Sequence, residues 1–120
     1  MSPDPTRSDV EAAISDEIVR IHRESFTGGD AAARAYVLDN EVLVIIDVDL
    51  SPSESTLVRS GRGDAVRATH ESFQEAIEST YRAVVERATG RRVVAFVSHM
   101  HLEPDFAVEL FRLEPHAAEA

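Results

Sequence analysis

The chain has 120 residues, of which 22 are acidic and 12 basic, so its formal net charge at pH 7 is −10. This length allows one domain with a buried core and leaves no room for a second. The negative charge argues against binding to nucleic acid or to an anionic membrane surface, because both need concentrated positive charge. Cysteine is absent, which excludes disulfides, thiolate nucleophiles and cysteine-based zinc sites.

The composition predicts a soluble, cytoplasmic protein. No apolar stretch reaches the ~18 residues that a membrane-spanning helix needs, and the first residues are polar, unlike a signal peptide. We expect residues 1–7 to form a flexible N-terminal arm, residues 8–115 a single domain and residues 116–120 a flexible C-terminal tail. No sequence pattern indicates a cofactor, so none is expected.

The first predicted element is an amphipathic helix. Ser8 or Asp9 is expected to cap its start, and the glycines within residues 27–30 are expected to end it. Its apolar positions are Val10, Ile14, Ile18 and Ile21, which recur at helical spacing.

A β-hairpin is predicted next, with strands at residues 34–38 and 41–48 and a two-residue turn at Asp39-Asn40. The second strand is apolar on both faces. Such a strand is normally covered on both sides, and one small domain has few helices with which to cover it. The pattern therefore indicates a surface that another protein covers.

Two helices follow. Ser51 is expected to cap a short helix to about Ser60, with Pro52 in its first turn and the Glu54 carboxylate completing the cap. Asp64 is expected to cap the longest helix. The predicted apolar stripe of that helix consists of Val66, Phe73, Ile77, Tyr81, Val84 and Ala88.

A second hairpin closes the predicted domain, with strands at residues 92–98 and 106–113. Glu109 stands between apolar neighbours and is expected on the exposed or interface side. The alternative is an inward carboxylate, which needs a partner and has a raised pKa. His22 and His70 are expected on helix surfaces or at their boundaries. The order α-ββ-αα-ββ predicts an α+β fold with a four-stranded, mostly antiparallel sheet packed with helices.

Residues 14–115 resemble the MpsC-like family of small bacterial proteins. The matching stretches are Ile18-Val19-Arg20-Ile21-His22-Arg23, Arg34-Ala35-Tyr36, Gly61-Arg62-Gly63-Asp64, Phe73-Gln74-Glu75-Ala76, Thr89-Gly90-Arg91-Arg92-Val93-Val94-Ala95-Phe96, Pro104-Asp105 and Val108-Glu109-Leu110-Phe111. The resemblance implies an association with a sodium- or bicarbonate-handling membrane system. The chain differs from the family pattern at Gly28-Gly29-Asp30 and at Ser98-His99, which weakens any ligand role carried over to those two loops.

Four side chains near the last turn are candidate metal ligands: His99, His101, Glu103 and Asp105. Residues two apart in a strand share a face, so the two imidazoles could bind one divalent ion side by side. The alternative is a solvated turn, since polar residues are common in hairpin loops.

Arginines are the candidate anion ligands. Arg91 and Arg92 follow a predicted helix C-terminus, where the helix dipole favours cations without any ligand. Together with Arg62 or Arg67 they could hold an anion such as bicarbonate if the fold brought them together.

No nucleophile with a partner base and no cofactor motif is present, so catalysis is not expected. The sequence favours a non-enzymatic accessory or regulatory protein that acts through protein contacts as a homodimer, with a membrane transport subunit as a further candidate partner. The alternative is a protein that binds a metal ion or an anion at the residues named above.

Overall fold

The fold combines three helices with a four-stranded sheet in the described residues, which are 6–25 and 31–116 of this computed structural model. The elements in chain order are α1 (Arg7–Ser25), β1 (Ala31–Leu38), β2 (Glu41–Val48), α2 (Pro52–Arg59), α3 (Gly63–Thr89), β3 (Val93–His101) and β4 (Phe106–Leu113). This is the predicted α+β order, which is confirmed. Of the predicted arm and tail, residues 1–5 and 117–120 lie outside the described residues.

The sheet has the strand order β1-β2-β4-β3, and each neighbouring pair is antiparallel. Both predicted hairpins are present, and their second strands pair with each other to form the centre of the sheet. β1 begins at Ala31, three residues before the predicted start. Alanine has little intrinsic strand preference, but here Ala31 lies opposite Val48 and is held by that pairing.

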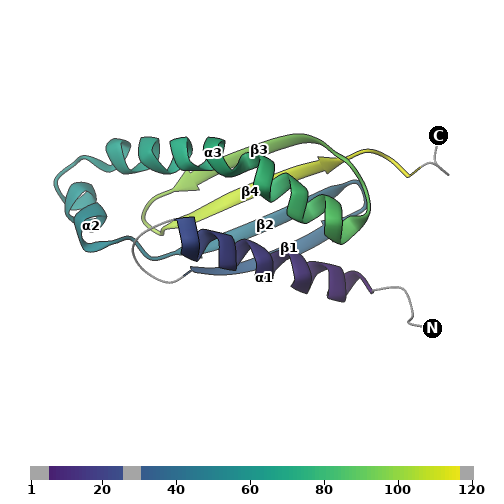
Figure 1. The fold of residues 1–120 in the computed structure, drawn as a ribbon. Helices are drawn as coiled ribbons and strands as arrows, with labels where there is room; N and C mark the ends of the chain where they lie inside the picture. The colour runs from purple at the N-terminus through teal and green to yellow at the C-terminus, as the bar shows by residue number, and fades with distance from the viewer. Residues whose placement is uncertain (1–5, 26–30, 117–120) are drawn as a thin grey trace.

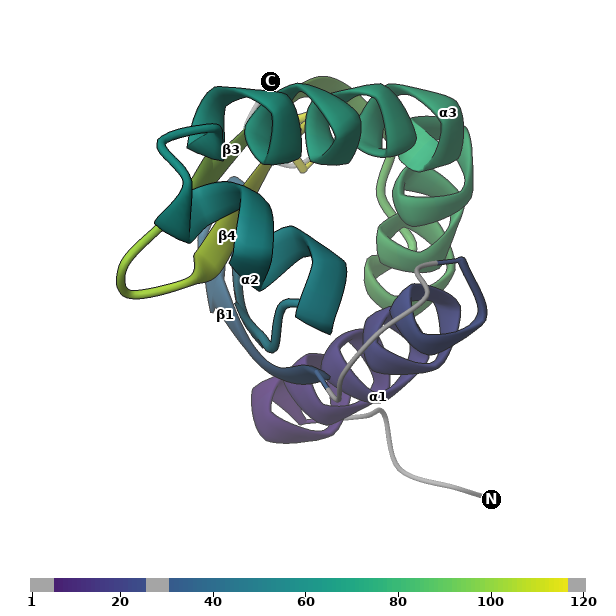
Figure 2. The same ribbon diagram turned by 90° about the vertical axis from the view of Figure 1, so that its left-hand side faces the viewer.

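Helices α1 and α3 pack on one face of the sheet, while α2 lies at one end of the molecule (Figure 1). Figure 2 shows that the other face, on the left of that view, carries no helix in the described part of the chain. The core lies between helices and sheet. Its fully buried members include Ile14, Ile18, Val42, Val44, Ile46, Tyr81, Val85 and Phe111.

The start of α1 differs from the prediction. Thr6 Oγ1 accepts a hydrogen bond from the Asp9 amide, and the Asp9 carboxylate accepts one from the Thr6 amide, both at 3.1 Å. These reciprocal bonds satisfy free amides of the first turn, so Thr6 rather than Ser8 or Asp9 caps the helix. The predicted end at residues 27–30 lies outside the described residues.

The ends of the other helices are mostly as predicted. Ser51 and Glu54 form the predicted capping box of α2, and Gly90 ends α3 with a left-handed φ of 68°. Asp64 is not the cap of α3: Arg62 occupies that position without a side-chain hydrogen bond, and Asp64 lies in the first turn. A carboxylate there still favours the helix through its dipole.

The buried stripe of α3 also differs from the prediction. Phe73 is 42 % exposed, whereas the neighbouring Gln74 is only 7 % exposed. Consecutive helical residues point about 100° apart, so when the Gln74 amide faces the core, the Phe73 ring points away from it. The first half of α3 therefore turns polar side chains, His70 and Gln74, towards the interior.

Among the described residues, we find no helix with the length and apolar character that crossing a membrane requires.

Candidate functional site

The sheet face that the helices leave uncovered, called the open face below, is formed by alternate residues of all four strands. Its members are Ala32, Arg34, Tyr36 and Leu38 of β1, Glu41, Leu43, Ile45 and Asp47 of β2, Phe106, Val108, Leu110 and Arg112 of β4, and Ala95, Val97, His99 and His101 of β3. Strand pairing places Tyr36, Leu43, Leu110 and Val97 in one apolar row across the whole sheet.

The open face is apolar at its centre and charge-balanced at its margins. Val97 is 61 % exposed and Leu38 is 51 % exposed. Its two arginines each face a carboxylate across the strands, Arg34 with Asp47 at 3.6 Å and Arg112 with Glu41 at 3.0 Å. The prediction that the central strands carry apolar groups on both faces is confirmed on this side.

A buried polar cluster lies under α3, on the opposite face of the sheet. Glu109 of β4 is fully buried there, which overturns the expectation that it faces outwards. Neither of its carboxylate oxygens has a hydrogen bond, and Gln74 Oε1 and the Tyr81 hydroxyl are likewise buried without one. Ser98, directly opposite Glu109 on β3, completes the cluster.

Burial governs the ionisation of this cluster. It raises the pKa of Glu109 to about 8, although the nearby Ser98 and Gln74 side chains oppose that shift. Burial, and then the charge of Glu109, raise the pKa of Tyr81. An ionised carboxylate without a partner is costly in a protein interior, so at neutral pH Glu109 is mostly protonated.

A pocket of about 250 Å³ between α3 and β3 adjoins this cluster, although Glu109 itself does not line it. Gln74 and Ser98 lie in its wall together with Phe96, and three carboxylates line it as well, those of Glu71, Glu75 and Glu78. Glu78 is paired with Arg82 at 2.9 Å. No basic residue lines the pocket, so its field favours cations.

A second polar contact joins the three helices. His70 Nε2 lies 2.7 Å from Glu54 Oε2, and both His70 and His22 are only 6 % exposed. Burial opposes ionisation of Glu54, but hydrogen bonds from Ser51 and His70 hold its pKa below the usual value. Burial, aided by His70, lowers the pKa of His22 to about 4. The expectation of two surface histidines was therefore wrong.

The structure brings together only part of the predicted metal site. His99 and His101 both lie on the open face of β3. His101 Nδ1 lies 2.9 Å from the carbonyl oxygen of Pro104, and the ring stacks on Phe106. Asp105 Oδ1 accepts a bond from the Glu103 amide. No group of three or more His, Asp or Glu side chains among the described residues is arranged to hold a metal ion, so this site stays a prediction.

The predicted anion ligands are not brought together. Arg62 precedes α3 and Arg91 follows it, and a helix of 27 residues separates them by roughly 40 Å along its axis. Arg91 instead donates to the carbonyl oxygens of Asp39 and Glu114, at 2.8 Å each, and to the Asn40 side chain. It thereby ties the first hairpin turn to the end of β4, and anion binding at Arg91 and Arg92 stays a prediction without Arg62.

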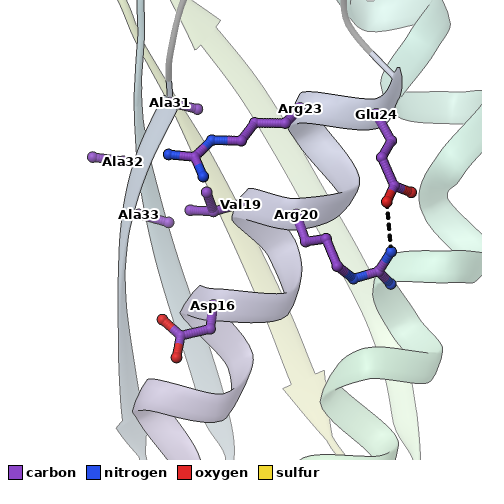
Figure 3. Close-up of a pocket in the computed structure, with 8 residues that line it drawn as sticks. All are labelled: Asp16, Val19, Arg20, Arg23, Glu24, Ala31, Ala32 and Ala33. Carbon is purple, nitrogen blue, oxygen red and sulfur yellow. Dashed lines mark hydrogen bonds and ion pairs between the residues drawn. The ribbon is translucent and has the colours of Figure 1, made fainter.

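A pocket of about 630 Å³ lies between α1 and β1. Figure 3 shows Arg23 extending towards Ala31–Ala33, while Arg20 is paired with Glu24. Asp16 lies in the same wall as Arg23. These opposite charges give the pocket no preference for an anion or a cation, so it carries no site assignment.

None of these clusters was fully visible in the sequence. The open face had a signal, the two-faced strands, whereas the Glu109 cluster had only the weak signal of one charged residue inside an apolar strand.

Neither the curated proteins nor the solved structures contain a significant match to this chain. A family model described as the Na⁺-translocating membrane potential-generating system (MpsC) matches residues 6–115. That match covers the whole sheet and all three helices of the described structure, and the chain therefore belongs to the MpsC family.

Proposed function

We propose that the protein is a non-enzymatic accessory or regulatory subunit that acts through protein–protein contacts as a cytoplasmic homodimer, with the open face as the dimer contact. The observation that carries this proposal is the row of apolar side chains across an uncovered sheet. Contiguous exposed apolar surface of this kind marks an interaction site, and two such sheets pack face to face about 10 Å apart.

Charge supports a second copy as the occupant. Each chain carries a net charge of −10, so most relative orientations of two copies are repulsive. On the open face the charged side chains are paired with each other, Arg34 with Asp47 and Arg112 with Glu41. Two copies that meet there bring together neutral, apolar surfaces.

The size of the open face is also suitable. Four strands of about eight residues cover roughly 500 Å² in projection, at about 4.8 Å between strands and 3.4 Å per residue. Side-chain relief increases the accessible area, so the face approaches the ~800 Å² that a standard interface buries on each partner.

Matched arginine substitutions test this contact. Leu38→Arg introduces a charge on the open face, whereas Leu57→Arg introduces one on α2, and both leucines are exposed in the protomer. We expect sedimentation at twice the 13.2 kDa chain mass for the unmodified protein and Leu57→Arg, and a monomer for Leu38→Arg and Val97→Arg. An unmodified protein that stays monomeric over a concentration series, or a dimer retained by both face variants, contradicts the proposal.

We further propose that this dimer serves a sodium- or bicarbonate-handling membrane system, and the Na⁺ translocation in the family description supports the sodium part of this proposal. Tagged protein isolated from native membranes at low salt should carry a membrane transport subunit with it. If the tagged protein is recovered alone, both without and with chemical cross-linking, the proposed association with a membrane transport subunit is contradicted.

Metal binding at the last hairpin is the second candidate function. When His101 Nδ1–H donates to the Pro104 carbonyl, Nε2 keeps its lone pair and faces away from that bond. His99 lies on the same face of β3. Calorimetry should then show zinc or nickel uptake that His99→Ala with His101→Ala abolishes, and uptake unchanged by the double substitution excludes these histidines as ligands.

A further inference from the structure

The buried cluster around Glu109 contains several side-chain oxygens without a hydrogen-bond partner. Both carboxylate oxygens of Glu109 and Oε1 of Gln74 are buried without a hydrogen bond. Native proteins rarely leave such groups unsatisfied, and an exception calls for a bound ion, a water molecule or a functional role. These oxygens lie close together, because Ser98 is the strand partner of Glu109 and shares one pocket wall with Gln74.

One of the pockets described above adjoins the cluster. The pocket between α3 and β3 has a volume of about 250 Å³, and the side chains of Gln74 and Ser98 form part of its wall. The Gln74 side chain is only 7 % exposed, yet it forms part of the pocket wall. A ligand in the pocket therefore meets the amide and the hydroxyl before it meets the carboxylate.

The donor set indicates the class of ligand. Carboxylate, amide and hydroxyl oxygens are hard donors, which suit alkali and alkaline-earth cations rather than soft transition metals. Glu109 supplies a single negative charge inside, which one monovalent cation neutralises. The pocket carboxylates Glu71, Glu75 and Glu78 raise the local concentration of cations at the entrance.

We propose that the pocket between α3 and β3 is a binding site for a monovalent cation, held by oxygens of Glu109, Gln74 and Ser98. When the cation binds, Glu109 releases its proton to solvent. The cation replaces the proton, so the net charge of the cluster is unchanged. The site is independent of the open face, which lies on the other side of the sheet.

The exchange makes binding depend on pH. Cation affinity should increase as the pH rises towards and past 8, because a proton then competes less for the carboxylate. No ionisation of the other groups that face Glu109 opposes this increase in cation affinity. Tyr81 of α3 stays neutral, since its pKa is raised, while Ser98 of β3 and Val44 of β2 carry no charge. The remaining charged groups are the pocket carboxylates on α3.

Thermal unfolding of the full chain tests the proposal. At pH 9 and constant ionic strength, sodium or potassium chloride should raise Tm relative to choline chloride, by about 4 °C once the cation exceeds its Kd several-fold. Glu109→Gln should abolish this difference, because it keeps the shape of the side chain but removes the charge that the cation neutralises. Asp49→Asn, which removes an exposed carboxylate outside the pocket, is the matched control and should keep it.

Proton release gives a second measurement that needs no variant. Addition of the favoured cation to weakly buffered protein near pH 8 should release up to one proton per chain, whereas choline should release none. Equal Tm in all three salts, a cation effect that survives Glu109→Gln, or the absence of proton release would each overturn the proposal. Equal Tm values without proton release would mean that Glu109 is protonated and binds no cation. A cation effect that survives Glu109→Gln would mean that the exposed carboxylates hold the cation.

Discussion

At the scale of single residues, Glu109 should dominate the pH dependence of stability. Burial raises its pKa to about 8 in the folded protein, from 4.5 for a freely solvated glutamate, so folding favours the protonated form. Its contribution is complete below about pH 4.5 and is lost as the pH rises to about 8, with a total on the order of 5 kcal/mol. Buried His22, with a pKa lowered to about 4, acts in the opposite direction below pH 6.5.

The difference between the unmodified protein and Glu109→Gln isolates this effect. Urea unfolding in choline buffers should show the free energy of unfolding falling between pH 6.5 and 8 for the unmodified protein and nearly constant for Glu109→Gln. Parallel curves for the two proteins would contradict an inward carboxyl group with a raised pKa.

Single residues were also where the sequence was least informative. The strand that contains Glu109 is apolar at the positions on both sides of it, so alternation did not decide which set faces the helices. The choice depends on strand register, including a β-bulge between Val93 and Ala95, and on which face α3 covers. The inward position of Gln74 rather than Phe73 has the same origin, since both lie at the margin of the α3 stripe.

At the scale of elements, the capping box of α2 offers a direct measurement. Ser51 Oγ accepts from the Glu54 amide at 3.2 Å, and Glu54 Oε1 accepts from the Ser51 amide at 2.9 Å. Ser51→Ala should lower the free energy of unfolding by about 1 kcal/mol. Ser53→Ala, two residues along the same exposed turn, should have a smaller effect, and equal losses would show that the cap contributes nothing specific.

Most elements could be predicted because their signals are local. Asp39-Asn40 forms a two-residue turn, Gly90 takes the left-handed conformation that ends a helix, and Ser51 caps α2. The exceptions were set by distant contacts. Ala31–Ala33 become strand because β2 is available for pairing, and His22 and His70 are buried because three helices meet there.

At the scale of the whole molecule, net charge should control dimerisation. Two chains of −10 each repel at long range, and the Debye length falls from about 30 Å at 0.01 M salt to about 10 Å at 0.1 M. Sedimentation at fixed pH should therefore show that the dimer Kd decreases as the sodium chloride concentration is raised over this range. Association that weakens with added salt would indicate a contact made by opposite charges rather than by the apolar open face.

The open face itself could be predicted in part. Apolar residues at every position of residues 42–46 indicated a strand that is apolar on both faces, and the structure confirms this, with one face under the helices and the other on the open face. Which face the helices take could not be read from the pattern, because the charged residues of the two strands conflict: β2 places Glu41 and Asp47 on the open face, whereas β4 places Glu109 under the helices.

The strand order has a consequence for how the chain folds. The two inner strands of the sheet, β2 and β4, are separated by residues 49–105, so the first hairpin has an unpaired edge until the last strand has emerged from the ribosome. Contacts this distant in sequence close slowly, and during that interval the exposed edge of β2 is a template for pairing with other chains. A nascent chain stalled after α3 is therefore the species of this protein most in need of a chaperone.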